Sequence, residues 1–219
     1  MAFEDYKTIQ KIERSFQLLR FDQYRIYPFT DAPPELQSMN RVWLCLPRNR
    51  SGIKALREHL RTRFSLPIIK DRPGVIEWQL ASGDRINIAS SMTEYLHRQR
   101  SAMNISGEWH GQLNHIVAKD FGVLARLQRD NTEDAEPLWD YFFAGIRGLG
   151  TWGAAWFVDR RYKLLQKFAD SENIELLLQV TFRNGRILDV IDVSDESEDF
   201  FKSEADSNVI GEVIAAYKE

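Results

Sequence analysis

Short apolar runs separated by polar turns follow one another along most of the chain, and they predict strands. The clearest runs cover residues 41–47, 75–80, 85–89, 121–127, 138–146, 174–182 and 187–193. The first of them fits a central strand. Turn residues at 82–84, a polar segment at 129–137 and Arg183-Asn-Gly-Arg186 join the other six runs in pairs. Since Gly, Asn and Asp favour tight turns, we expect three β-hairpins.

Helical periodicity separates several of these strands. Ile9, Ile12, Phe16 and Leu19 recur at helical spacing within residues 3–21, and three prolines at 28–34 then exclude regular structure. We therefore expect an N-terminal helical arm and a proline-rich linker over residues 1–38. Further helices are expected at 53–64, from Ser90 onward, from about 151 to 168, and at 209–217. Residues 39–219 should form one α/β domain whose mixed sheet is flanked by helices.

Composition places the chain among soluble globular proteins. It has 219 residues, of which 43% are hydrophobic and 28% charged, so one domain of ordinary size with a proper core is expected. No apolar run approaches the roughly 20 residues that cross a bilayer, and the first residues lack a signal-peptide pattern. The single cysteine, Cys45, excludes an internal disulfide and fits a reducing compartment. We expect a cytoplasmic protein without a membrane partner.

Charge is distributed unevenly along the sequence. Residues 41–72 carry nine Lys and Arg against two acidic residues, whereas residues 192–206 carry seven acidic residues against one lysine. One interpretation is a basic face at 41–72 that contacts nucleic acid or an acidic partner. The other is that the two segments complement each other within one chain or between copies in a homo-oligomer.

The stretch Gly148-Leu-Gly-Thr-Trp-Gly153 has the glycine spacing of a dinucleotide-binding turn. A strand precedes it and a helix follows, and a helix N-terminus favours an anion because its first N–H groups lack partners within the helix. We therefore expect Arg147, Gly148, Gly150, Thr151 and Gly153 to form an anion cradle. NAD is disfavoured, because no acidic residue ends the next strand and that strand enters a hairpin. The structural alternative is a strand-to-helix turn whose glycines allow only close packing.

A second group of candidates follows the strand at 41–47. If that strand and the strand at 138–146 are neighbours, Arg48, Asn49 and Ser51 would face the glycine stretch, because ligands bind beyond the carboxyl ends of strands in α/β sheets. Ser90 and Ser91 would complete the rim if the strand before them points the same way. Taken singly, each is better explained as a solvated side chain or an ordinary helix cap.

Catalytic motifs are missing from the sequence. The four histidines, at 59, 97, 110 and 115, lack a metal-binding helical spacing, and one cysteine is too few for a thiolate metal site. There is no Walker lysine and no nucleophile elbow. We expect no metal and no cofactor. Ser90, Glu94 and Asp159 are the candidates if the protein is instead a small nucleotide-processing enzyme, such as a glycosidase or a phosphate-transfer enzyme.

About a third of the chain carries a family resemblance. Asp120-Phe-Gly-Val-Leu-Ala-Arg126, Ala144-Gly-Ile146 and Gly150-Thr-Trp-Gly-Ala154 resemble a Rossmann-like bacterial domain, akin to the SLOG class, from conflict and antiphage defence systems. The resemblance implies a nucleotide-sensing or effector-associated subunit that binds a phosphate-bearing small molecule. Members of that family carry a histidine after Ala-Gly-Ile, where this chain has Arg147. A helix-turn-helix, TIR or NTPase partner would have to be a separate effector chain.

Overall fold

The computed structural model describes residues 8–12, 14, 39–45, 55–57, 59, 61–67, 75–90, 118–129, 137–146, 148–167, 173–183 and 186–206. The strands are β1 (Arg41–Cys45), β2 (Phe64–Ser65), β3 (Val75–Gln79), β4 (Arg85–Ala89), β5 (Ala118–Gln128), β6 (Trp139–Gly145), β7 (Ile174–Arg183) and β8 (Arg186–Asp192). The helices are α4 (Gly148–Lys167) and α5 (Glu198–Asp206). The chain therefore has mixed α/β content.

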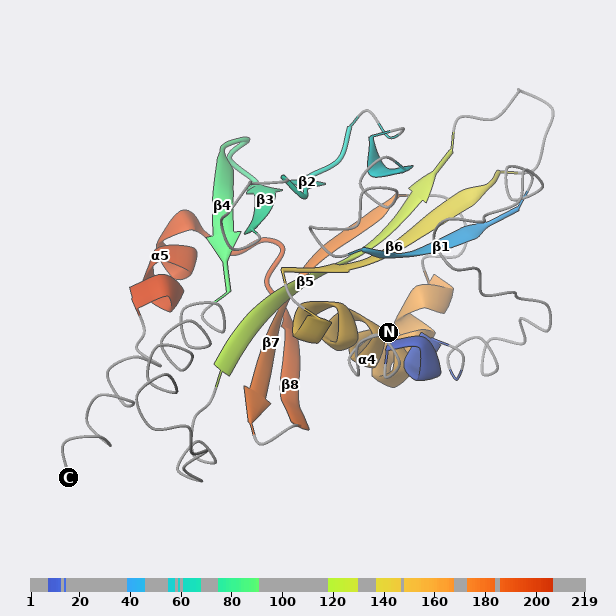
Figure 1. The fold of residues 1–219 in the computed structure, drawn as a ribbon. Coiled ribbons are helices and arrows are strands. Elements are labelled where there is room, and N and C mark those ends of the chain that lie inside the picture. The colour runs from blue at the N-terminus through green and yellow to red at the C-terminus, as the bar shows by residue number, and fades with distance from the viewer. Residues whose placement is uncertain are drawn as a thin grey trace, which may run out of the picture.

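A five-stranded mixed sheet in the order β1-β6-β5-β7-β8 forms the centre of the structure (Figure 1). The β1 strand runs parallel to β6, and the other neighbours pair antiparallel. The hairpins predicted from the polar segment at 129–137 and from Asn184-Gly185 are confirmed as β5–β6 and β7–β8. The prediction of a central strand at 41–47 is wrong for the described residues, because β1 lies at the end of the sheet and Val42 is 37% exposed.

The third predicted hairpin is β3–β4, which belongs to a second sheet in the order β2-β3-β4. Its turn contains Gly83 at a φ of 94°, a conformation that L side chains rarely adopt and that glycine allows at no steric cost. The side chains of Ile76 and Trp78 alternate toward the interior. This small sheet therefore has one buried face and one solvated face.

The central sheet is covered on both faces. Phe142 and Ala144 of β6 point into one hydrophobic cluster, which includes residues of the small sheet and Phe201 of α5. Phe143, between them in the strand, points into the opposite cluster, which contains Ala154, Phe157 and Val158 of α4. Figure 1 shows the same arrangement, with α4 on one side of the sheet and β2–β4 and α5 on the other. The predicted mixed sheet is confirmed, and α4 covers one of its faces, whereas the other face is covered mainly by the small sheet, with Phe201 of α5 beside it.

Part of the N-terminal segment lies against α4. Residues 8–12 and 14 are helical, Thr8 is fully buried, and Ile12 packs in the same cluster as α4. The Lys11 ammonium lies 2.7 Å from a carboxylate oxygen of Asp159, and Arg14 Nε lies 3.3 Å from the other oxygen. Asp159 is thus held in ion pairs between two helical segments. The proline-rich linker, the helix expected from Ser90 onward (apart from Ser90 itself) and the helix expected at 209–217 lie outside the described residues.

Candidate functional site

The carboxyl ends of β1 and β6 meet at one edge of the central sheet. Their parallel register pairs Arg41 with Asp140 and Cys45 with Ala144, so the two strands end next to each other. This satisfies the condition under which Arg48, Asn49 and Ser51 were expected to face the glycine stretch. Those three residues, together with Ser91 and Arg147, lie outside the described residues.

The chain leaves these two strands toward opposite faces of the sheet. After β1, the next described residues are Ala55 and Leu56, which are buried in the cluster that contains Phe142 and the small sheet. After β6, the chain enters α4, whose buried side chains belong to the cluster on the other face. Two adjacent parallel strands with diverging connections define a position where α/β sheets commonly bind ligands.

The glycines of the predicted cradle lie within α4 itself. The helix begins at Gly148, so the expectation of a glycine turn followed by a helix from about Thr151 is wrong by about one turn. A Cβ on Gly150 would stand 2.1 Å from the carbonyl oxygen of Phe121, and one on Gly153 would stand 2.2 Å from a methyl of Val180. These two glycines therefore allow α4 to lie directly against β5 and β7, as the packing interpretation of the stretch predicts.

A buried carboxylate already occupies the N-terminus of α4. The Gly150 N–H donates to Asp120 Oδ2 at 2.7 Å, and the Asp120 side chain has no solvent exposure. A negative charge at this end of a 20-residue helix is stabilised by the helix dipole. One sequence signal of this contact is an acidic residue directly before the apolar run at 121–127, since a buried charge requires a partner.

Two further predicted residues lie in or near the first turn of α4. Thr151 is buried at 1% exposure and Gly148 is half-buried. Ser90 is also buried, and its hydroxyl donates to the Lys119 carbonyl at 3.5 Å, next to Asp120. The β4 strand before Ser90 belongs to the second sheet, so Ser90 reaches this edge across the face of the central sheet. The structure thus gathers Ser90, Gly148 and Thr151 at one edge.

A group of charged side chains lies at the other end of β6, away from the start of α4. This group was not predicted from the sequence. Asp140 near the start of β6 is fully buried and accepts two hydrogen bonds from Arg41, at 2.6 and 2.5 Å. His59 Nε2 lies 3.0 Å from Asp140 Oδ2, and Arg129 Nε lies 3.7 Å from Oδ1. Burial alone would raise the pKa of Asp140, but hydrogen bonds from Arg41 and His59 and the nearby guanidinium charges outweigh it and lower that pKa. We call these four residues the Asp140 cluster.

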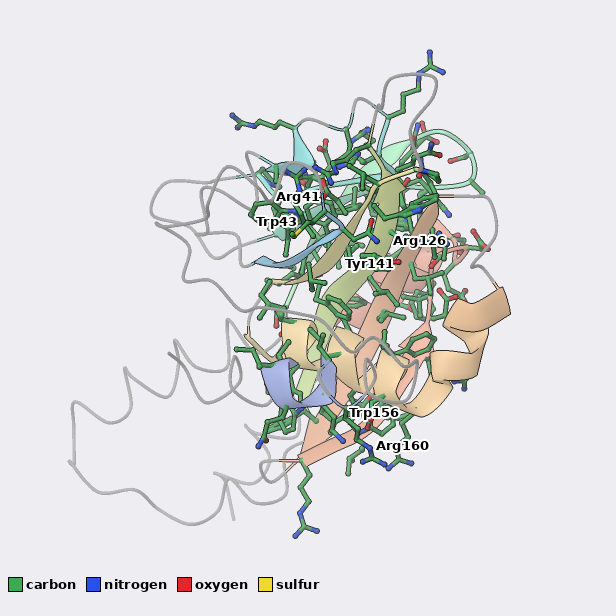
Figure 2. All side chains as sticks on the ribbon, turned by 90° about the vertical axis from the view of Figure 1, so that its right-hand side faces the viewer. Arg41, Trp43, Arg126, Tyr141, Trp156 and Arg160 are labelled. Carbon is green, nitrogen blue, oxygen red and sulfur yellow. The ribbon has the colours of Figure 1, made fainter. Side chains whose placement is uncertain are left out.

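Arginine side chains stack on aromatic rings at both ends of the molecule. Figure 2 shows Arg41 with Trp43 at one end and Arg160 with Trp156 at the other, and their guanidinium-to-ring distances are 5.2 and 4.6 Å. Arg126 lies between them, and its guanidinium stands 3.7 Å from the Trp139 ring centroid. Stacked arginines gain cation–π energy and protect ring faces from water. Two of these pairs lie on or beside strands of the central sheet, and the Arg160–Trp156 pair lies within α4.

Some arginine side chains of the basic stretch at 41–72 form hydrogen bonds and ion pairs within the molecule. Arg41 belongs to the Asp140 cluster, and Arg63 donates to the Ser194 carbonyl at 2.8 Å and lies 3.4 Å from Asp195. The contact with Asp195 joins the basic segment to the acidic one within a single chain. Arg57 and Arg61 are exposed. Among the four described arginines of this stretch, two therefore contribute to internal contacts and two face solvent.

The remaining chemical candidates are limited within the described part of the chain. No group of three or more His, Cys, Asp or Glu side chains there is placed to hold a metal ion. Asp159, considered above as an acid or base, is paired with Lys11 and Arg14. In the ranges that the structure covers, no helix combines the length and the apolarity needed to cross a membrane. Glu94 and the other three histidines lie outside these ranges.

Comparison of the chain with protein-family models, with curated proteins and with solved structures found no match.

Proposed function

We propose that the chain binds a phosphate-bearing, nucleotide-like small molecule where β1 and β6 end and α4 begins. The observation that carries this proposal is the divergence of the chain after the two strands, toward Ala55 and Leu56 on one face and α4 on the other. In α/β sheets, such a divergence leaves a crevice beyond the carboxyl ends of the strands. The domain would then be Rossmann-like over residues 39–219.

In this proposal, arginine side chains supply the positive charge that binds the phosphates. The Asp120 carboxylate already accepts the hydrogen bond of the Gly150 N–H. The N-terminus of α4 alone therefore attracts a second anion less strongly. Arg48 and Arg147 stand in the two segments that follow β1 and β6, and a guanidinium can hold two phosphate oxygens at once. Asn49 and Ser51 add hydrogen-bonding groups beside Arg48. We therefore assign the phosphates to Arg48 and Arg147.

The biological setting that we propose follows the family resemblance. The chain would act as a nucleotide-sensing or effector-associated subunit in a bacterial antiphage complex, with a separate effector chain as its partner. Residues 1–38 would form a helical arm, consistent with the ion pairs that Lys11 and Arg14 make with Asp159. Ligand-dependent binding of an effector would be the output of such a sensor.

Calorimetric titration with AMP, ADP and ATP tests the proposal. We expect the wild-type chain to bind at least one of them, and Arg147→Ala and Arg48→Ala each to weaken binding about tenfold or more, because a lost guanidinium–phosphate pair removes a charge-assisted hydrogen bond. Arg160→Ala is the matched control, because Arg160 is exposed farther along α4. Absence of binding at millimolar nucleotide would contradict the proposal. Equal loss in the Arg160 variant would place the ligand elsewhere.

A further inference from the structure

The β8 strand is the outermost strand at one end of the central sheet, and within the described residues no strand pairs with its outer side. The Val193 N–H donates to the Leu177 carbonyl at 2.8 Å, so residue 193 faces β7. The β7–β8 register continues this pairing through Ile191 and Asp189. Because backbone groups alternate in direction along an antiparallel strand, the N–H groups of Val190, Asp192 and Ser194 point to the outer side.

Two of these three outward N–H groups, those of Val190 and Ser194, are capped by side chains of β8 itself. Val190 N–H donates to Asp189 Oδ1 at 2.9 Å, and Ser194 N–H donates to Asp192 Oδ1 at 3.0 Å. The register also shifts by one residue at Thr181 and Phe182, which leaves Leu188 as an extra residue on β8. Capped donors and a bulge both remove hydrogen-bonding positions that an incoming strand would use.

The side chains on the same strand would otherwise favour association. Leu188 is 52% exposed and Ile191 is 42% exposed, and both belong to the few large apolar side chains of the described residues that face solvent. An outer strand that combines exposed apolar side chains with free backbone donors pairs readily with another strand. On β8 the apolar side chains are present, and the outward donor at Val190 is occupied.

We infer that Asp189 prevents β8 from pairing with β8 of a second copy of this chain. An antiparallel pair with two-fold symmetry about Val190 would use its outward N–H and C=O groups. In that register residue 189 lies opposite Ile191 of the second copy, because 189 and 191 are equidistant from Val190. Asp189 opposes this pairing twice, since its carboxylate occupies the Val190 N–H and would lie directly beside an apolar isoleucine side chain.

Light scattering coupled to size-exclusion chromatography tests this inference on the full-length chain. We expect Asp189→Val to double the apparent molar mass relative to wild type, whereas Asp189→Asn, which keeps an acceptor oxygen for the Val190 N–H, does not. Adding Leu188→Lys to Asp189→Val should restore the wild-type mass, because a lysine on the exposed edge opposes pairing. Asp189→Ala removes the same acceptor with a smaller side chain and serves if the valine variant does not fold. Wild-type mass in a folded Asp189→Val or Asp189→Ala variant would overturn the inference.

Discussion

Replacing Asp140 by asparagine should be among the most destabilising single changes in the central sheet. The side chain has no solvent exposure and lies within 3.0 Å of polar atoms of both Arg41 and His59, with Arg129 at 3.7 Å. Asparagine fills the same space but carries no charge, so the cationic groups around it lose their counter-ion. Removing one partner of a buried ion pair costs about 3–5 kcal/mol. For a chain of this size, 3 kcal/mol corresponds to a fall in Tm of roughly 6–12 °C.

Urea unfolding followed by tryptophan fluorescence measures this loss directly. The matched control is Asp195→Asn, which makes the same chemical change in an ion pair whose carboxylate is 85% exposed. We expect the control to stay within about 0.5 kcal/mol of wild type, because exposed ion pairs contribute little. A loss below about 1 kcal/mol in Asp140→Asn would refute the argument that the Asp140 cluster holds β1, His59 and the end of β5 together.

The lowered pKa of Asp140 also fixes the sign of a pH effect. The Asp140 carboxyl group loses its proton more readily in the folded chain than in the unfolded chain. The stability that it contributes is therefore present above its unfolded pKa and is lost as the pH falls through the folded pKa. The difference in unfolding free energy between wild type and Asp140→Asn should shrink toward acid pH. A difference that grows in acid would contradict the assignment.

Two other predictions concern Glu175 and the glycines of α4. Burial raises the pKa of Glu175 above its ordinary value of 4.5, although the Arg63 backbone N–H donates a hydrogen bond to its carboxylate. The folded chain therefore loses stability as the pH rises through the folded pKa of Glu175. Glu175→Gln should therefore be more stable than wild type at neutral pH and equal to it in acid, as pH-dependent urea melts would show; lower stability at neutral pH would refute this. Gly150→Ala should lose roughly 1–3 kcal/mol, because its Cβ meets a backbone carbonyl, and Gly153→Ala should lose less, because its Cβ meets the movable side chain of Val180. Thermal melts that rank the two alanine variants in the opposite order would contradict the packing argument.

Local sequence signals were sufficient to predict one hairpin of the central sheet and the hairpin of the small sheet. Asn184-Gly185 and Ser82-Gly83-Asp84 specify tight turns through their own backbone preferences, so the pairs β7–β8 and β3–β4 follow from a few adjacent residues. The parallel pairing of β1 with β6 involves about 100 intervening residues and has no such signal. From the sequence, the pairing of β1 with β6 could be stated only as a condition for Arg48, Asn49 and Ser51 to face the glycine stretch.

The charged contacts were beyond the reach of sequence spacing. Asp120 and Gly150 are 30 residues apart, and Arg41 and Asp140 are 99 residues apart. No period or motif links such positions, because their contact depends on how the strands are ordered. An acidic residue next to or inside an apolar run, as at Asp120 and Asp140, is the one local sign that a buried partner exists. The glycine spacing at 148–153 likewise left binding and packing open, and the contacts of Gly150 and Gly153 show packing at those two positions.

Photo-crosslinking with an azido-substituted ATP, followed by mass spectrometry of the labelled peptides, tests the central proposal most directly. It distinguishes the two edges of the sheet, one at the start of α4 and the other at the Asp140 cluster, which also contains cationic groups. We predict saturable labelling within residues 46–54 or 147–153, removed by an excess of unlabelled nucleotide. Saturable labelling around Arg41, His59 and Arg129, or labelling that no nucleotide competes away, would contradict the account.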